Sequence, residues 1–263
     1  MLVLIRGAGD LASGVGYLLK TCGFQVIMTD LPRPTAIRRT VAFSPAITDG
    51  TAVVEGVTGR RAADPGEARQ IAAGPEIAVL ADPELNCLGE LRPDVLIDAI
   101  LAKKNLGTRL GDAPFVIALG PGFIAGQDCH CVIETKRGHW LGRPIYDGPA
   151  SPNTGVPGNI GGFTAERIIR SPKAGLFRPL ASIGDLVEAG QQVASVDDTP
   201  VTAPITGVLR GILPADTPVF AGMKSGDVDP RAQRDYCFTI SDKARAIAGG
   251  VLAAIIANSG VIR

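Results

Sequence analysis

The chain has 263 residues, of which 46% are hydrophobic and 20% charged, and its formal net charge at pH 7 is zero. This composition predicts a chain that folds without help, as one large domain or two modest ones. The neutral balance gives no sign of nucleic-acid binding, for which a basic domain is expected. The five cysteines are odd in number and irregularly spaced, which disfavours a secreted disulfide scaffold.

The chain carries no pattern of a targeting or membrane segment. Its first apolar run ends at Arg6, which is too short for a signal peptide and lacks the basic leader. The late apolar run at residues 246–257 contains two glycines and is too short to cross a bilayer. Together with the cysteine pattern, these features predict a cytoplasmic protein with no membrane partner.

The first half alternates short apolar runs with amphipathic or polar stretches. The runs are rich in Val and Ile, and several lack alternation, which is typical of parallel strands covered on both faces. Helical spacing predicts a helix over residues 10–22, ended by Gly23. The expected strands are residues 2–5, 25–29, 77–81, 94–101 and 115–119. We therefore expect a Rossmann-like α/β domain, a parallel sheet with helices, over residues 1–125.

Glycine and proline gather in the middle of the chain, which predicts a connecting and ligand-loop region at 126–170. Residues 171–240 change to short β runs with close turns, similar to the barrel-sandwich hybrid of lipoyl and biotinyl carrier domains. The hairpin tip at residues 197–200 lacks the lysine that a swinging arm needs, so carrier chemistry is not expected. A C-terminal helix, capped by Ser241 and packing on the fold, is expected over residues 241–263.

The strongest candidate site is the turn Gly7-Ala8-Gly9-Asp10-Leu11-Ala12, which lies between a strand and a helix. Gly7 allows a tight turn, Gly9 lets a phosphate approach the backbone, and Ala12 lets helix and strand pack closely. The helix N-terminus offers free N–H groups and a partial positive charge. Asp30 ends the second strand, where an acidic residue usually binds a ribose hydroxyl.

Two features qualify this site. Asp10 places a carboxylate inside the turn, which could repel a pyrophosphate. Arg33, Arg38 and Arg39 follow Asp30 and favour an additional phosphate or another anion. The alternative interpretation is a Rossmann scaffold that has lost its nucleotide.

Two further segments are candidates for the same site. Gly120-Pro121-Gly122 follows the fifth strand and should lie near the glycine turn, because ligands bind beyond the carboxyl ends of such strands; the alternative is a plain turn. Residues 134–143 combine a carboxylate, several cations and the single tryptophan. This segment predicts an anion-binding loop facing the glycine turn, or else a solvated charged hairpin. Its candidate residues are Glu134, Arg137, His139 and Arg143.

No metal site is predicted. Cys129-His130-Cys131 resembles a ligand cluster, but adjacent residues of a strand point to opposite faces, so the three side chains cannot easily converge. Residues 226–231 carry too few regularly spaced carboxylates for a calcium loop. A structural Asp–Arg turn is the better interpretation of Asp227, Asp229 and Arg231.

Several strings, in the same order over nearly the whole chain, resemble the YqeB family, which is associated with the selenium-dependent molybdenum hydroxylase system. They are Arg6-Gly-Ala-Gly-Asp-Leu-Ala, Arg38-Arg39-Thr-Val-Ala-Phe, Gly120-Pro-Gly-Phe with Ala125-Gly126, Ile133-Glu-Thr with Arg137-Gly-His, Leu141-Gly-Arg143, Gly226-Asp-Val-Asp-Pro-Arg, and Asp242-Lys-Ala-Arg with Gly249-Gly-Val-Leu. The family is also similar to XdhC-type maturation factors in having a Rossmann-like domain. The resemblance implies a maturation role, with a molybdenum hydroxylase apo-enzyme as partner, and it assigns no catalytic residue.

Three functions remain open from the sequence. The chain could be an accessory protein that binds the molybdenum cofactor, as molybdopterin or its dinucleotide form, on the glycine turn. It could be an NAD(P)-dependent oxidoreductase, although no Tyr-x-x-x-Lys motif supplies a proton-transfer group. It could be a non-catalytic scaffold with an empty Rossmann fold. The apolar helix and β surface are compatible with a homodimer.

Overall fold

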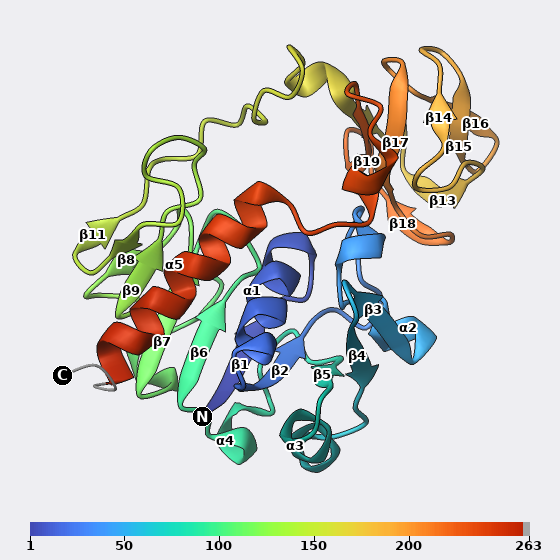
Figure 1. The fold of residues 1–263 in the computed structure, drawn as a ribbon. Coiled ribbons are helices and arrows are strands. Elements are labelled where there is room, and N and C mark those ends of the chain that lie inside the picture. Colours follow the sequence, from blue (N-terminus) through green and yellow to red (C-terminus); the bar gives the residue numbers. More distant parts are fainter. Residues whose placement is uncertain (260–263) are drawn as a thin grey trace. The chain divides into compact units, whose positions relative to one another are not determined.

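The computed structural model of the chain describes residues 1–259 (Figure 1). The chain forms two compact units, the first from residues 1–34, 42–153 and the segment beginning at Ile240, the second from residues 35–41 and 154–239. The sequence places the first boundary at residue 125. Residues 126–153 remain in the first unit because β9 (Cys131–Ile133) and β10 (Pro144–Ile145) extend its sheet. Residues 260–263 of the expected C-terminal helix lie outside the described residues.

Within residues 1–259, the first unit contains a nine-stranded sheet in the order β10-β9-β7-β6-β1-β2-β5-β4-β3. Neighbouring strands from β4 to β9 run parallel, and the two edge pairs are antiparallel. Its other strands are β1 (Leu2–Arg6), β2 (Gln25–Thr29), β3 (Thr51–Val54), β4 (Val57–Arg61), β5 (Ile77–Leu80), β6 (Val95–Asp98) and β7 (Phe115–Leu119). The chain steps outward from β1 and then returns to β6 on the other side of β1. The strand order therefore reverses between β1 and β6.

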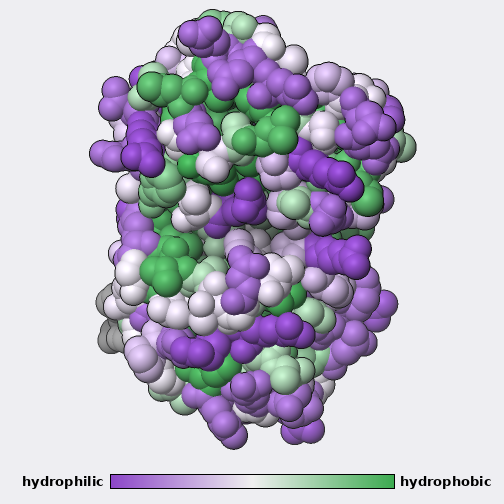
Figure 2. Space-filling model, turned by 90° about the vertical axis from the view of Figure 1, so that its right-hand side faces the viewer, coloured by the Kyte–Doolittle hydropathy of each residue, from purple (hydrophilic) through white to green (hydrophobic). Residues whose placement is uncertain are grey.

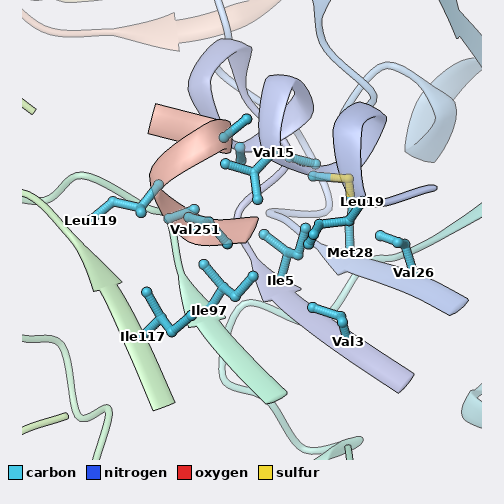
Figure 3. Packing of buried hydrophobic residues seen from close by; sticks show 14 of the residues in the cluster. Val3, Ile5, Val15, Leu19, Val26, Met28, Ile97, Ile117, Leu119 and Val251 are labelled. Atoms are coloured by element: carbon cyan, nitrogen blue, oxygen red, sulfur yellow. The ribbon is translucent and has the colours of Figure 1, made fainter. Parts of the chain in front are cut away.

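Helices cover both faces of this sheet. The helices α1 (Asp10–Thr21) and α5 (Asp242–Ser259) pack against each other on one face, whereas α3 (Pro65–Ala73) and α4 (Leu88–Leu91) contribute to the apolar layer on the other. In Figure 3 the strand residues Ile5, Ile97 and Ile117 face Val15 of α1 and Val251 of α5. The strands are buried on both faces, which explains their continuous apolar sequence.

The expected elements of the first half are confirmed with small changes in length. β2 and β7 match the predicted ranges, β6 is shorter than residues 94–101, and α1 ends at Thr21 just before Gly23, whose φ is 88°. Ser241 caps α5, since its hydroxyl accepts a hydrogen bond from the Ala244 N–H at 3.2 Å. The hairpin β3–β4 and α3 had no counterpart among the predicted elements. The remaining short elements of this unit are α2 (Ala46–Asp49), η2 (Leu110–Asp112), β8 (Ile124–Ala125) and β11 (Gly148–Pro149).

The second unit contains two four-stranded antiparallel sheets, in the orders β12-β19-β17-β14 and β16-β15-β13-β18, among the described residues. Their buried residues, among them Phe177 and Leu209, form one core, and Ile37 of the 35–41 segment packs against it. The strands are β12 (Ile168–Arg170), β13 (Gly175–Pro179), β14 (Leu186–Val187), β15 (Gln192–Val196), β16 (Thr199–Thr202), β17 (Gly207–Ile212), β18 (Thr217–Val219) and β19 (Lys224–Asp229), with short helices η1 (Arg39–Val41), η3 (Ala165–Arg167) and η4 (Arg234–Cys237).

Charged side chains inside the second unit are paired. Arg167 forms a buried ion pair with Asp227, and Arg231 binds Asp229 at 2.6 Å while its backbone N–H donates to the same carboxylate at 3.1 Å. The predicted structural Asp–Arg turn is therefore confirmed. Asp229 is buried, and although burial raises its pKa, hydrogen bonds from Arg231 outweigh that effect and hold the pKa below its ordinary value.

Some large hydrophobic side chains remain exposed in both units, among them Trp140 and Leu186. Figure 2 shows one face of the molecule, on which hydrophobic residues are interspersed with hydrophilic ones. Such scattered exposure is ordinary for a folded protein. No helix within residues 1–259 has the length and apolar character needed to cross a membrane.

Candidate anion-binding site

The glycine turn lies where β1 ends and α1 begins, beside the point at which the strand order reverses. Gly7 adopts φ 107°, and a Cβ there would lie 3.0 Å from the carbonyl oxygen of Ala99 after β6. Only glycine fits this position without strain. Gly7 is therefore required by the fold itself.

Gly9 differs from Gly7. Its φ of −75° is open to any residue, and it is the N-cap residue of α1, without a side-chain hydrogen bond to the helix. Apart from its chain neighbours, no heavy atom of the described residues lies within 4 Å of the position that a Cβ would occupy. The first N–H groups of a helix have no partner within the helix. The helix terminus at Gly9 is thus sterically open.

Several hydrogen bonds hold the turn in place. The Gly7 N–H donates to the Thr29 carbonyl at 2.8 Å, and the Ala8 N–H donates to the Asp30 carboxylate at 2.9 Å. The Ala8 carbonyl accepts from the Ser44 N–H and the Ser13 hydroxyl, both at 3.0 Å. The backbone at the start of α1 is therefore fixed without a ligand.

Asp30 lies at the end of β2, as predicted, but its carboxylate is already engaged. Its second oxygen accepts the Leu31 N–H at 2.8 Å. Burial raises the pKa of Asp30, and the hydrogen bonds from Leu31 and Ala8 only partly oppose this effect. The side chain that the sequence assigns to a ribose thus positions the turn.

Gly120 and Gly122 follow β7, and each approaches another part of the first unit. A Cβ at Gly120 would lie 2.5 Å from the Thr135 hydroxyl oxygen, and one at Gly122 would lie 2.5 Å from the backbone nitrogen of Lys104. Both have positive φ. Internal packing is therefore sufficient to explain why these two positions are glycine.

Glu134 follows β9 and is buried, 3% exposed. Its carboxylate accepts the Lys136 N–H at 2.7 Å and the Ser151 N–H at 2.8 Å. Burial alone raises the pKa of Glu134, but these hydrogen bonds together outweigh burial and hold the pKa below its ordinary value. Glu134 therefore organises the loop after β9 as an ionised carboxylate.

The other candidates of residues 134–143 lie at the surface. Arg137 forms a bidentate ion pair with Asp242 in the first turn of α5, at 2.6 and 2.9 Å. His139 is exposed, and the guanidinium of Arg143 lies 4.7 Å from the ring centre of Trp140. A Cβ at Gly142 would overlap the carbonyl group of Ala246 in α5. The hairpin loop is thus fastened to α5 at both of these points.

Arg38 and Arg39 belong to the second unit. The Arg38 guanidinium donates to the carbonyls of Tyr236 and Thr239 at 3.1 and 3.3 Å, and Arg39 donates to the Ile212 carbonyl at 3.0 Å. These two arginines therefore organise backbone of their own unit. Their predicted role toward a ligand remains a prediction.

Lys243, which sequence reasoning did not select, is a half-buried cation whose charge interacts with two of the candidate residues, Asp10 and Glu134. Lys243 is the second residue of α5, and its electrostatic neighbours include Asp10, Glu134, Arg137 and Asp242. Burial, followed by the charge of Arg137, lowers the pKa of Lys243, and the carboxylates partly oppose this. Lys243 belongs to the string Asp242-Lys-Ala-Arg. Nothing in the sequence around it indicates a relation to the glycine turn at residues 7–12, which lies far earlier in the chain.

Beneath the site, two charged residues join the ends of β1 and β6. Arg6 and Asp98 are buried and form an ion pair at 3.5 Å, and the Thr108 hydroxyl donates to Asp98 at 2.6 Å. Arg6 also donates to the carbonyls of Pro83 and Leu106. This network fixes the loops around the strand ends.

The cysteine–histidine string does not converge on one point. Cys129 and Cys131 are buried, burial raises the pKa of each thiol to about 12 and about 11, and His130 accepts the Val116 N–H at 2.9 Å. Within residues 1–259, no group of three or more His, Cys, Asp or Glu side chains is arranged to hold a metal ion.

This chain is similar to a protein of Escherichia coli named uncharacterized protein YqeB. The two are 53% identical over 255 residues, which cover 97% of this chain and 47% of that protein. The chain thus spans about half the length of this curated relative. No protein-family model matches the chain.

Solved structures give only weak likenesses. An aspartoacylase family protein from Mesorhizobium loti has a TM-score of 0.30 at 12% identity, over 88% of this chain and 85% of that one. The ectoine utilization protein EutE from Ruegeria pomeroyi has a TM-score of 0.25 at 13% identity, over 86% and 84%. These scores are too low to indicate a common fold.

Proposed function

We propose that this chain binds a phosphate-bearing ligand on the glycine turn, as an accessory protein in the maturation of a molybdenum hydroxylase. The ligand would be molybdopterin or its dinucleotide form, held for transfer to the apo-enzyme. The single observation that carries the binding site is the open space at Gly9, at the start of α1. The maturation role and the partner come from the resemblance to the YqeB family.

The physical support for phosphate binding is preorganisation. A helix N-terminus attracts anions through its free N–H groups and its partial positive charge. The hydrogen bonds of Gly7 and Ala8 fix the turn in advance, so little conformational freedom is lost on binding. A phosphate placed above Gly9 would accept hydrogen bonds from backbone that is already in position.

The strand order supports a finer description of the first unit as Rossmann-like. In open α/β sheets, ligands bind outside the carboxyl ends of the strands where the strand order reverses. Here that point lies between β1 and β6, directly beside the turn. We describe the second unit, with its two small sheets and shared core, as barrel-sandwich-hybrid-like.

Asp30 favours the accessory role over an NAD(P)-dependent oxidoreductase. Each of its carboxylate oxygens already accepts a backbone N–H, so the group expected to bind an adenosine ribose is engaged in the turn. His130 is engaged by Val116, and His139 is exposed in the hairpin loop. Neither histidine is therefore positioned at the glycine turn as a proton-transfer group for hydride chemistry.

Calorimetric titration of the purified chain with molybdopterin, its cytosine dinucleotide and NAD(P)H tests the proposal. We expect the pterin compounds to bind and Gly9→Asp to abolish that binding, since it adds bulk and negative charge at the open position. Gly89→Asp is the matched control, because Gly89 is exposed in α4, and nothing lies within 4 Å of its Cβ position among the described residues. Binding of NAD(P)H alone would contradict the proposal and favour the oxidoreductase. No binding of any probe would favour the scaffold.

A further inference from the structure

A cleft of about 400 Å³ lies in the first unit, at the opposite end of α1 from the glycine turn. It is lined by the last residues of α1 and α3, by the start of β2 and by Val57 at the start of β4. Ligand sites in proteins commonly have volumes of about 300–1,000 Å³, so the cleft has room for a small molecule. The 12 residues of α1 span about 18 Å, which separates this cleft from the proposed phosphate site.

Lys20 is the charged residue of the lining. Its ammonium donates hydrogen bonds to the carbonyls of Ala72 and Gly74 at the end of α3, at 2.9 and 2.6 Å. An ammonium has three N–H donors, so one of them has no acceptor among the described residues. No carboxylate within residues 1–259 forms an ion pair with Lys20, and burial lowers the pKa of its ammonium. The end of α3 offsets this positive charge only through the partial charges of its carbonyls.

Most of the remaining lining is apolar. Phe24 and Val57 are half-buried, line the cleft and pack against the core of the first unit, and Pro75 adds apolar surface. Gln25 also lines the cleft and carries a side-chain amide that can donate a second hydrogen bond. A phosphate requires more donors than these two groups supply, whereas a carboxylate on a short hydrocarbon matches both the donors and the apolar walls.

We propose that this cleft binds a small aliphatic carboxylate. The carboxylate accepts the remaining N–H of Lys20 in a charge-assisted hydrogen bond, and the hydrocarbon part lies against Phe24 and Val57. The bound anion supplies the negative charge that Lys20 lacks among the described residues. This site is independent of the glycine turn and does not rest on the function proposed above.

Backbone amide NMR during titration of the chain with isovalerate tests this site. We expect saturable shifts of the signals of Gly23, Phe24 and Gly74, and none with isovaleramide, which has the same shape without the charge. Lys20→Met keeps the length of the side chain and removes its charge, so it should weaken isovalerate binding by about tenfold or more. Lys136→Met, at an exposed lysine away from the cleft lining, is the control and should bind as the unaltered chain does.

Because Lys20 also bonds the end of α3, a second variant leaves these bonds in place. Ala73→Leu adds bulk at an exposed residue of the lining and should weaken isovalerate binding with little change in the melting temperature. Unaltered affinity in Ala73→Leu would place the ligand outside the cleft, and unaltered affinity in Lys20→Met would remove the role of the ammonium. Equal shifts with isovaleramide, or no saturable shift with isovalerate, would overturn the carboxylate site.

Discussion

The backbone N–H of Ala8 donates a hydrogen bond to the carboxylate of Asp30 at 2.9 Å. This bond joins the end of β2 to the turn that follows β1. In dinucleotide-binding domains an acidic residue in this position commonly binds a ribose hydroxyl. In this chain the carboxylate instead holds the backbone of the turn on which a phosphate would lie. The geometry of the turn therefore depends on a side chain from the neighbouring strand.

Asp30→Ala should destabilise the first unit. The substitution leaves the N–H of fully buried Ala8 without its acceptor, and an unsatisfied buried donor costs about 1–3 kcal/mol. Urea unfolding monitored by circular dichroism measures the change. An unaltered unfolding midpoint would show that the turn does not depend on Asp30.

Substitution by alanine should cost more stability at Gly7 than at Gly9. Gly7→Ala places a Cβ against the Ala99 carbonyl at positive φ, and such backbone strain costs about 1–3 kcal/mol. Gly9→Ala meets open space at an ordinary φ, so only the weaker N-cap preference of alanine, about 0.5–1 kcal/mol, should be lost. The melting temperatures of the two variants provide the comparison. Equal losses in both would contradict the distinction between a glycine required by the fold and one that leaves space for a ligand.

The adjacent glycines of α5 offer a second matched pair. A Cβ at Gly250 would overlap the carbonyl oxygen of Gly142, whereas the Cβ position of Gly249 has no neighbour within 4 Å among the described residues. Gly250→Ala should therefore separate α5 from the hairpin loop and lower the melting temperature strongly. Gly249→Ala should raise stability by up to about 1 kcal/mol, the difference in helix propensity between the two residues. A stabilising Gly250→Ala would show that this packing is wrong.

Glu134 should make stability depend on pH. Its folded-state pKa is lowered, so its contribution is present above the unfolded value of about 4.3 and is lost as the pH falls through the lower folded value. Glu134→Gln should cost about 1–3 kcal/mol at neutral pH, because one buried N–H then faces an amide donor. Chemical denaturation across the acid range should show the difference from the unaltered chain shrinking below about pH 4. A difference that grows on acidification would reverse the assigned sign.

Local pattern was sufficient for the elements that position the turn. The apolar runs of β1 and β2 and the spacing of α1 follow from side-chain periodicity, and the N-cap at Ser241 follows from its hydroxyl. Gly7 and Gly9 could be placed by the same means, since the strand–turn–helix order is contiguous in the chain. Close packing at the paired glycines of α5 was also predictable, although only Gly250 requires it.

Contacts between distant segments could not be predicted in the same way. β9 and β10 are too short to show a period of their own and join the sheet only through their neighbours. Lys243 is polar in a helix that the sequence predicts to be apolar, and its charge interacts with Asp10 although the two residues lie far apart in the chain. Arg38 and Arg39 follow Asp30 closely in sequence, but their segment belongs to the second unit. There the two guanidinium groups donate hydrogen bonds to backbone carbonyls.

Backbone amide NMR during titration with molybdopterin cytosine dinucleotide tests the central claim most directly, because it reports the position of the ligand. We predict saturable shifts of the amide signals of Gly9, Asp10 and Leu11. Titration of Gly9→Asp should abolish them together. Saturable binding that leaves the signals of Gly9 to Leu11 unmoved would place the ligand elsewhere and contradict the account.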